Sequence, residues 1–227
     1  MSRFTVPVAC VLASAGFVIT MWMIFEYAPL ERELYFNQKI FYYHVAHAFM
    51  LFVAVGVCGV SSVVFLKTRN PRWDDLALAA AEVAVAFGAV VLATGSIWAR
   101  AAWGTWWVWE TRLMMSLLLW LVLVAYVIVR RFAGGSADRL AAGLALFGTV
   151  AVPFIYMMVK KSDHHPQAGP SGAAATLPPR MALVMWLSVA TFLCWFIALV
   201  VSRVASARAE RELRELREQA LDAGLIS

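Results

Sequence analysis

Six long apolar runs constrain the fold of this chain more than any other feature. They cover residues 4–25, 40–66, 76–99, 113–129, 140–159 and 181–202, and the fourth is expected to extend back through Thr111. A helix needs about 20 apolar residues to cross a bilayer, and the runs lack the period of two that barrel strands show. With 63% of the 227 residues hydrophobic, the sequence predicts an all-α, polytopic membrane protein with six transmembrane helices.

Basic residues predict how these helices are oriented. The short connections at 67–75 and 130–139 each carry three Lys or Arg, and five Arg follow the sixth run. The positive-inside rule places that side, and with it both termini, in the cytoplasm. Connections 26–39, 100–112 and 160–180 are then external, which means periplasmic in a bacterial inner membrane.

Residues 1–203 would form the membrane domain and residues 204–227 a charged cytoplasmic helix. Glu26 follows the first run where a signal peptide would have small residues, so that run is read as a permanent helix.

Five of the ten tryptophans lie within residues 98–109, in the predicted external loop between the third and fourth helices. Tryptophan favours the membrane–water interface, so these residues could simply anchor the protein there. Their density, with a break at Gly104-Thr105 and a charge on either side (Arg100, Glu110), instead favours a binding surface for a large flat ligand. The five are Trp98, Trp103, Trp106, Trp107 and Trp109.

All four histidines are predicted to lie near this external face. His44 and His47 begin the second helix, and His164 and His165 follow the fifth. A single histidine in a span is usually a packing residue, whereas two sites beside an aromatic segment suggest a ligand. Two imidazoles with many aromatic rings suit haem held without covalent bonds, because no Cys-x-x-Cys-His attachment motif is present. Arg100 and Arg112 could pair with haem propionates or with lipid phosphates.

The tryptophan segment carries a family resemblance. The runs TGSIW at 94–98 and WGTWWVWETRL at 103–113 closely resemble the WWD signature of haem-handling proteins. Within that superfamily, the chain is most similar to the haem exporter protein C family (CcmC) of cytochrome c biogenesis system I. The resemblance extends to about residue 203 and includes the six spans.

The resemblance implies a function and a set of partners. The family brings haem b to the external face and loads it onto a membrane-anchored haem chaperone. Its other partners are a small single-span subunit and an ABC transporter, which consists of a membrane subunit and an ATPase.

The resemblance also implies haem ligands. His44, in YYHVAHA, matches the family's His-Val-Pro-Ala-Ala motif. The second ligand follows a proline that Pro153 matches; His165, followed by Pro166, is the better candidate and His164 the alternative. The chain departs from the family in three ways. Glu110 replaces an Asp, and Ala46 replaces the Pro after His-Val, with His47 standing where the family has a small residue. An expected aromatic pair before the second histidine is absent. His47 could be a substitute ligand, but a supporting role beside the haem ligands or a packing role is favoured.

Several function classes are disfavoured by the sequence. It has no phosphate-binding Gly-x-x-x-x-Gly-Lys-[Ser/Thr] loop and no nucleophile–base pairing that reads as an active site, so the chain is predicted not to be an enzyme. A bis-histidine haem b subunit for electron transfer and a cofactor-free structural subunit of a transporter are the alternatives. Glu82, an acid inside the third span, could line a path for haem, but a hydrogen-bonded packing role, or extension of its side chain to the near membrane surface, is favoured.

Overall fold

The computed structural model describes residues 4–32, 34–133, 137–159 and 177–225. In this part of the chain, six helices are long and apolar enough to cross a membrane, and no strand is formed beyond one isolated bridge between Glu31 and Tyr35. The all-α, six-helix prediction is therefore confirmed. The helices are α1 (Thr5–Trp22, continued by the π-helical turn Met23–Tyr27), α2 (Lys39–Thr68, preceded by the 3-10 turn Phe36–Gln38), α3 (Pro71–Trp103), α4 (Thr111–Phe132), α5 (Asp138–Val159) and α7 (Pro179–Asp222).

Most of the helices are longer than the apolar runs that predict them. α3 starts where the Asn70 side chain accepts a hydrogen bond from the Arg72 N–H at 3.1 Å. It ends at Gly104, whose φ of 73° is the left-handed conformation that stops a helix. Trp98 and Trp103 therefore lie on the last turns of α3, and the loop proper is 104–110. α7 continues for 44 residues through the predicted domain boundary at 203. A helix of that length spans about 66 Å, roughly twice the hydrocarbon thickness.

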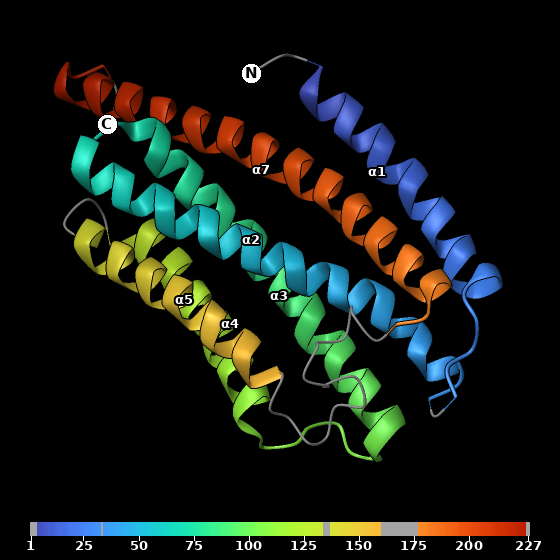
Figure 1. Cartoon of the computed structure of the whole chain (residues 1–227). Coiled ribbons are helices and arrows are strands. Elements are labelled where there is room, and N and C mark those ends of the chain that lie inside the picture. Colours follow the sequence, from blue (N-terminus) through green and yellow to red (C-terminus); the bar gives the residue numbers. More distant parts are fainter. Residues whose placement is uncertain (1–3, 33, 134–136, 160–176, 226–227) are drawn as a thin grey trace.

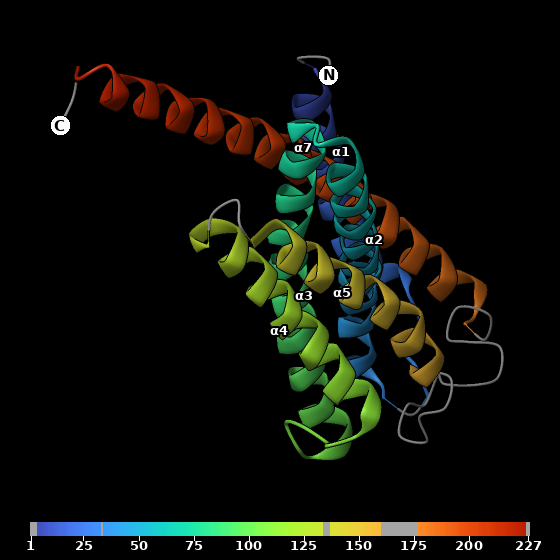
Figure 2. The same cartoon turned by 90° about the vertical axis from the view of Figure 1, so that its left-hand side faces the viewer.

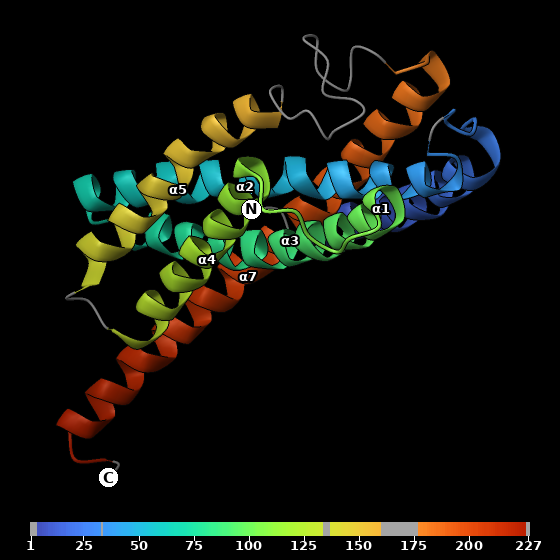
Figure 3. The same cartoon turned by 90° about the horizontal axis from the view of Figure 1, so that it is seen from below.

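α2 and α3 form the centre of the bundle as an antiparallel pair. α1 and α7 lie together on one flank, and α4 and α5 on the other (Figures 1–3). A row of small residues on α3, including Ala77, Ala80 and Ala84, is almost completely buried. Small side chains let membrane helices approach closely, which explains the tight centre. The outward faces carry large apolar side chains suited to lipid.

Ion pairs connect the helices at the end of the bundle that carries both termini, here called the terminal end (Figure 2). Glu82 of α3 accepts hydrogen bonds from Nε of Arg131 at 3.0 Å and from Nε of Arg203 at 2.6 Å. Further along α7, Arg211 pairs with the buried Asp75 at 2.9 Å. Glu82 thus has the hydrogen-bonded role that the sequence favoured, and the extension of α7 is attached to the first turn of α3.

Candidate functional site

His44 lies near the opposite end of the bundle, which we call the tryptophan end because it carries the α3–α4 connection. Its Nδ1 is 2.9 Å from the hydroxyl oxygen of Thr94 on α3. That hydroxyl also lies 2.6 Å from the Val90 carbonyl and 3.3 Å from the Val91 carbonyl. When its proton is donated to one of these carbonyls, its oxygen accepts from the Nδ1–H of His44. In that tautomer, the neutral imidazole carries a lone pair on Nε2, which can bind a metal ion.

Gly95 provides the space for this histidine. A Cβ atom added at Gly95 would lie 3.2 Å from Cε1 of His44. The imidazole thus packs directly against the backbone of α3, beside the hydroxyl that binds it. Thr94 and Gly95 belong to the TGSIW run, yet no role for either followed from the sequence. Trp98 comes one helical turn later, about 6 Å further along α3.

The five tryptophans form two edge-to-face pairs and one separate ring rather than a single stack. Trp98 and Trp103 have ring centroids 5.0 Å apart on α3, and Trp107 and Trp109 in the loop have centroids 6.2 Å apart. Trp106 and Trp109 are 59% and 77% exposed. The indole N–H of Trp107 is buried without a hydrogen-bond partner in the described part of the chain. The segment therefore offers open aromatic faces and one unused donor.

The charged residues of the segment have partners of their own. Arg100 donates to the Gly104 carbonyl and so closes the end of α3. Arg112 pairs with Glu110 at 2.6 Å at the start of α4, and their side chains are only 12% and 16% exposed. Arg112 also lies within electrostatic range of His44. A haem propionate would have to share these two arginines with the groups they already bind.

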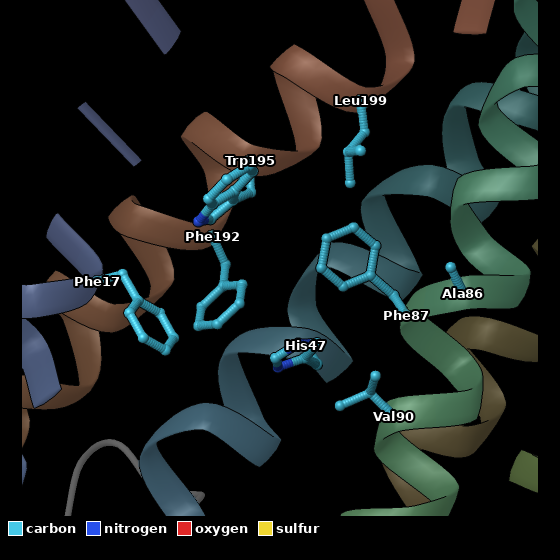
Figure 4. A pocket seen from close by; sticks show the side chains of 8 residues that line it. All are labelled: Phe17, His47, Ala86, Phe87, Val90, Phe192, Trp195 and Leu199. Atoms are coloured by element: carbon cyan, nitrogen blue, oxygen red, sulfur yellow. The ribbon is translucent and has the colours of Figure 1, made fainter. Parts of the chain in front are cut away.

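His47 lies one turn beyond His44 and has different neighbours. Its Nδ1 donates to the Tyr43 carbonyl at 2.6 Å. Its ring centroid is 5.3 Å from that of Phe87 and 4.2 Å from that of Phe192. These contacts place His47 in an aromatic pocket between helices (Figure 4). Its predicted supporting role at the haem site remains a prediction.

The second predicted ligand lies outside the described residues. This applies to His165, to its alternative His164, and to most of the connection between α5 and α7. Of the predicted site residues that are described, the structure brings His44 together with Arg112 and, through Thr94 and Gly95, with the tryptophan-bearing end of α3.

Comparison with known families bears on the identity of this site. The family model described as "Heme exporter protein C" matches residues 1–219. The chain belongs to this family. A "Heme exporter protein C" from Bradyrhizobium diazoefficiens is 30% identical over 83% of this chain and 73% of its own length. One from Paracoccus denitrificans is 31% identical over 78% of this chain and 76% of its own length. A "Putative cytochrome c biosynthesis ccmC-like mitochondrial protein" from Marchantia polymorpha is 31% identical over 65% of this chain and 61% of its own length.

Membership of the haem exporter protein C family confirms three expectations. The chain is a multi-pass protein of the bacterial inner membrane, since its six apolar helices accompany bacterial relatives of this family. It is a membrane subunit of a transport system rather than an enzyme. The resemblance that the tryptophan segment suggested is correct.

The residues at the tryptophan end fit haem. In its Nδ1–H tautomer, His44 has an imidazole lone pair on Nε2, and haem iron takes such a lone pair as an axial ligand. The unused N–H of Trp107 is a donor for an oxygen of the ligand, and the open faces of Trp106 and Trp109 suit a porphyrin plane.

Proposed function

We propose that this chain binds haem b at the external, periplasmic face of the inner membrane and delivers it to a membrane-anchored haem chaperone. Its family supports a role in haem export for the maturation of c-type cytochromes, within a haem-handling membrane complex. We further propose that the complex contains an ABC transporter, made of a membrane subunit and an ATPase, and a small single-span subunit. Since the chain has no phosphate-binding loop, ATP would be hydrolysed by a partner.

The geometry of His44 carries this proposal. Its Nδ1 lies 2.9 Å from the Thr94 hydroxyl, which can donate to the Val90 carbonyl at 2.6 Å. In the tautomer that satisfies both bonds, Nε2 is left as a lone pair. Metal-binding histidines are commonly oriented by such a bond from the other ring nitrogen. We assign His44 as one axial ligand of the haem iron and His165 as the second, with His164 as the alternative.

The tryptophans would hold the porphyrin from the side that faces water. Trp106 and Trp109 are the most exposed of the five, and both lie in the loop rather than on α3. Haem resting on them would keep one edge open to a partner protein. An open edge suits transfer, because cargo that must leave is released more easily from a surface than from a closed cavity.

The test is a pair of measurements on cells that carry only one version of the chain. The first is the haem content of the purified protein, and the second is the yield of a mature c-type cytochrome. We expect His44→Ala to lower both, because it removes a ligand of the iron. Val53→Ala, a lipid-facing change further along α2, should leave both unchanged. Full haem content and full cytochrome yield in His44→Ala would refute the proposal.

A further inference from the structure

The ion pair between Glu110 and Arg112 is a local structure that is largely shielded from water. Nη2 of Arg112 lies 2.6 Å from Oε1 of Glu110, and neither side chain is more than 16% exposed. Glu110 immediately precedes α4, and Arg112 lies on its first turn. Because only one residue separates them, the pair forms without contacts from distant parts of the chain, and it is present without any ligand.

The pair lies beside the proposed iron ligand. Arg112 is within electrostatic range of His44, and the buried N–H of Trp107, which has no partner in the described part of the chain, comes five residues before Arg112. An imidazole, a cation and a neutral donor therefore occur together at the tryptophan end. Haem carries two carboxylates at one edge, and arginine binds carboxylates through strong, charge-assisted hydrogen bonds. A carboxylated porphyrin held by His44 would bring its acidic edge to this cation.

That carboxylate would meet an arginine that already has a partner. With Glu110 still in place, one cation would face two carboxylates in a region shielded from water, and the surplus negative charge is costly there. Glu110 is the group that can leave. Its backbone is extended, with φ −102° and ψ 156°, and its side chain makes no capping hydrogen bond to α4. Turning this side chain toward water therefore removes no cap from the helix.

We propose that Glu110 competes with a carboxylate of the bound porphyrin for Arg112. The Glu110–Arg112 pair opens when a carboxylated porphyrin binds and forms again when the porphyrin leaves. Charge is balanced in both states, because Arg112 faces one carboxylate in each. This inference rests on the proposed function and adds a means of release, since Glu110 weakens the hold on a cargo that must be passed on.

Titration of the full chain in mild detergent with haem, and with haem dimethyl ester as a probe whose carboxylates are both blocked, tests this. We expect Glu110→Gln to lower the dissociation constant for haem at least about fivefold, because the competing carboxylate is lost. Transfer of haem to excess apomyoglobin should slow by a similar factor. The dissociation constant for the ester should stay within about twofold, because the ester cannot displace Glu110. Glu212→Gln removes the same charge from an exposed site on α7 and should bind both porphyrins like the unmodified chain.

A second variant guards against misfolding of Glu110→Gln. Glu110→Asp keeps a carboxylate beside Arg112 on a shorter arm, so its haem affinity should lie between those of Glu110→Gln and the unmodified chain. The proposal is wrong if both variants bind haem no more tightly than the unmodified chain, which would mean that Glu110 only holds Arg112 in position or has no effect. It is also wrong if the ester gains as much affinity as haem.

The haem proposal has its own readout in the same titrations. Loss of both porphyrins in His44→Ala supports that proposal whatever the Glu110 variants do. An unmodified chain that binds neither porphyrin would overturn both proposals.

Discussion

Replacing Gly95 by alanine tests whether the packing of α2 on α3 positions the haem ligand. The added Cβ would lie 3.2 Å from Cε1 and 3.9 Å from Nδ1 of His44. Carbon atoms pack best at about 3.5–4.0 Å, so the ring must retreat by roughly 0.3–0.8 Å. The bond from Nδ1 to Thr94 is now 2.9 Å and would stretch to or beyond the usual limit of about 3.2 Å.

The expected loss of haem affinity can be worked out from the weakened hydrogen bond between His44 and Thr94. A typical hydrogen bond contributes about 0.5–1.5 kcal/mol net, and its loss here frees the imidazole to rotate or change tautomer. If that energy appears in haem binding, affinity falls roughly 2- to 13-fold. The assay is a haem titration of the apo-protein in mild detergent, followed by the Soret absorbance.

Gly56→Ala is the matched control, because it lies on α2 and has no atom within 4 Å of the added Cβ. Both substitutions favour helix by up to about 1 kcal/mol, so a difference between them reports on His44 and not on helix propensity. A folded Gly95→Ala protein with unchanged haem affinity and spectrum would refute the reasoning.

Three other outcomes are expected. Thr94→Val removes the hydroxyl that binds His44, so the haem spectrum should shift and the affinity for haem should fall about tenfold. Thr94→Ser keeps a hydroxyl and should have the spectrum and affinity of the unmodified protein. Equal haem titrations for the two variants would contradict this. Glu82→Gln removes the carboxylate that pairs with Arg131 and Arg203 and should lower the free energy of unfolding by about 1–2 kcal/mol, as measured by thermal denaturation in detergent. The solvent-exposed Glu212→Gln should lower it less, and equal losses in the two variants would show that the network is unimportant. With the native cysteines replaced, an impermeant maleimide should label Thr105→Cys in intact spheroplasts and Gln219→Cys only after lysis, and the reverse pattern would invert the predicted topology.

The six helices could be predicted because each places a long apolar run in lipid. The length and hydrophobicity of such a run can be read directly from the sequence. The residues at which the helices begin and end could not be predicted in this way, because hydropathy identifies only the stretch of each helix that lies inside the hydrocarbon layer. α3 continues for several residues past Ala99 until Gly104 permits the left-handed turn that ends it. α7 continues into water because ion pairs such as Arg211–Asp75 attach it to α3.

The candidate site was predicted only in part. His44 stood out as a histidine near a helix end beside an aromatic segment, and that reasoning needs no knowledge of packing. The roles of Thr94 and Gly95 depend on the register between α2 and α3, since only that register brings residue 44 opposite residues 94 and 95. No spacing within the sequence encodes a contact across 50 residues.

The surroundings of His47 also depend on how the helices pack. Its spacing of three from His44 puts both histidines on a similar helix face, and the sequence left a role beside the haem site and a packing role open. Its neighbours Phe87 and Phe192 come from α3 and α7, and these helices enclose a separate pocket. A pocket lined by four helices has no signature in any one of them.

The most direct test of the central claim is the absorption spectrum of the protein purified from haem-replete cells in mild detergent, compared with His44→Ala and His165→Ala. The account predicts a low-spin Soret band with resolved α and β bands in the unmodified protein, and their loss or shift in each variant, because each removes one imidazole from the iron. A spectrum that is unchanged in His44→Ala would contradict the account.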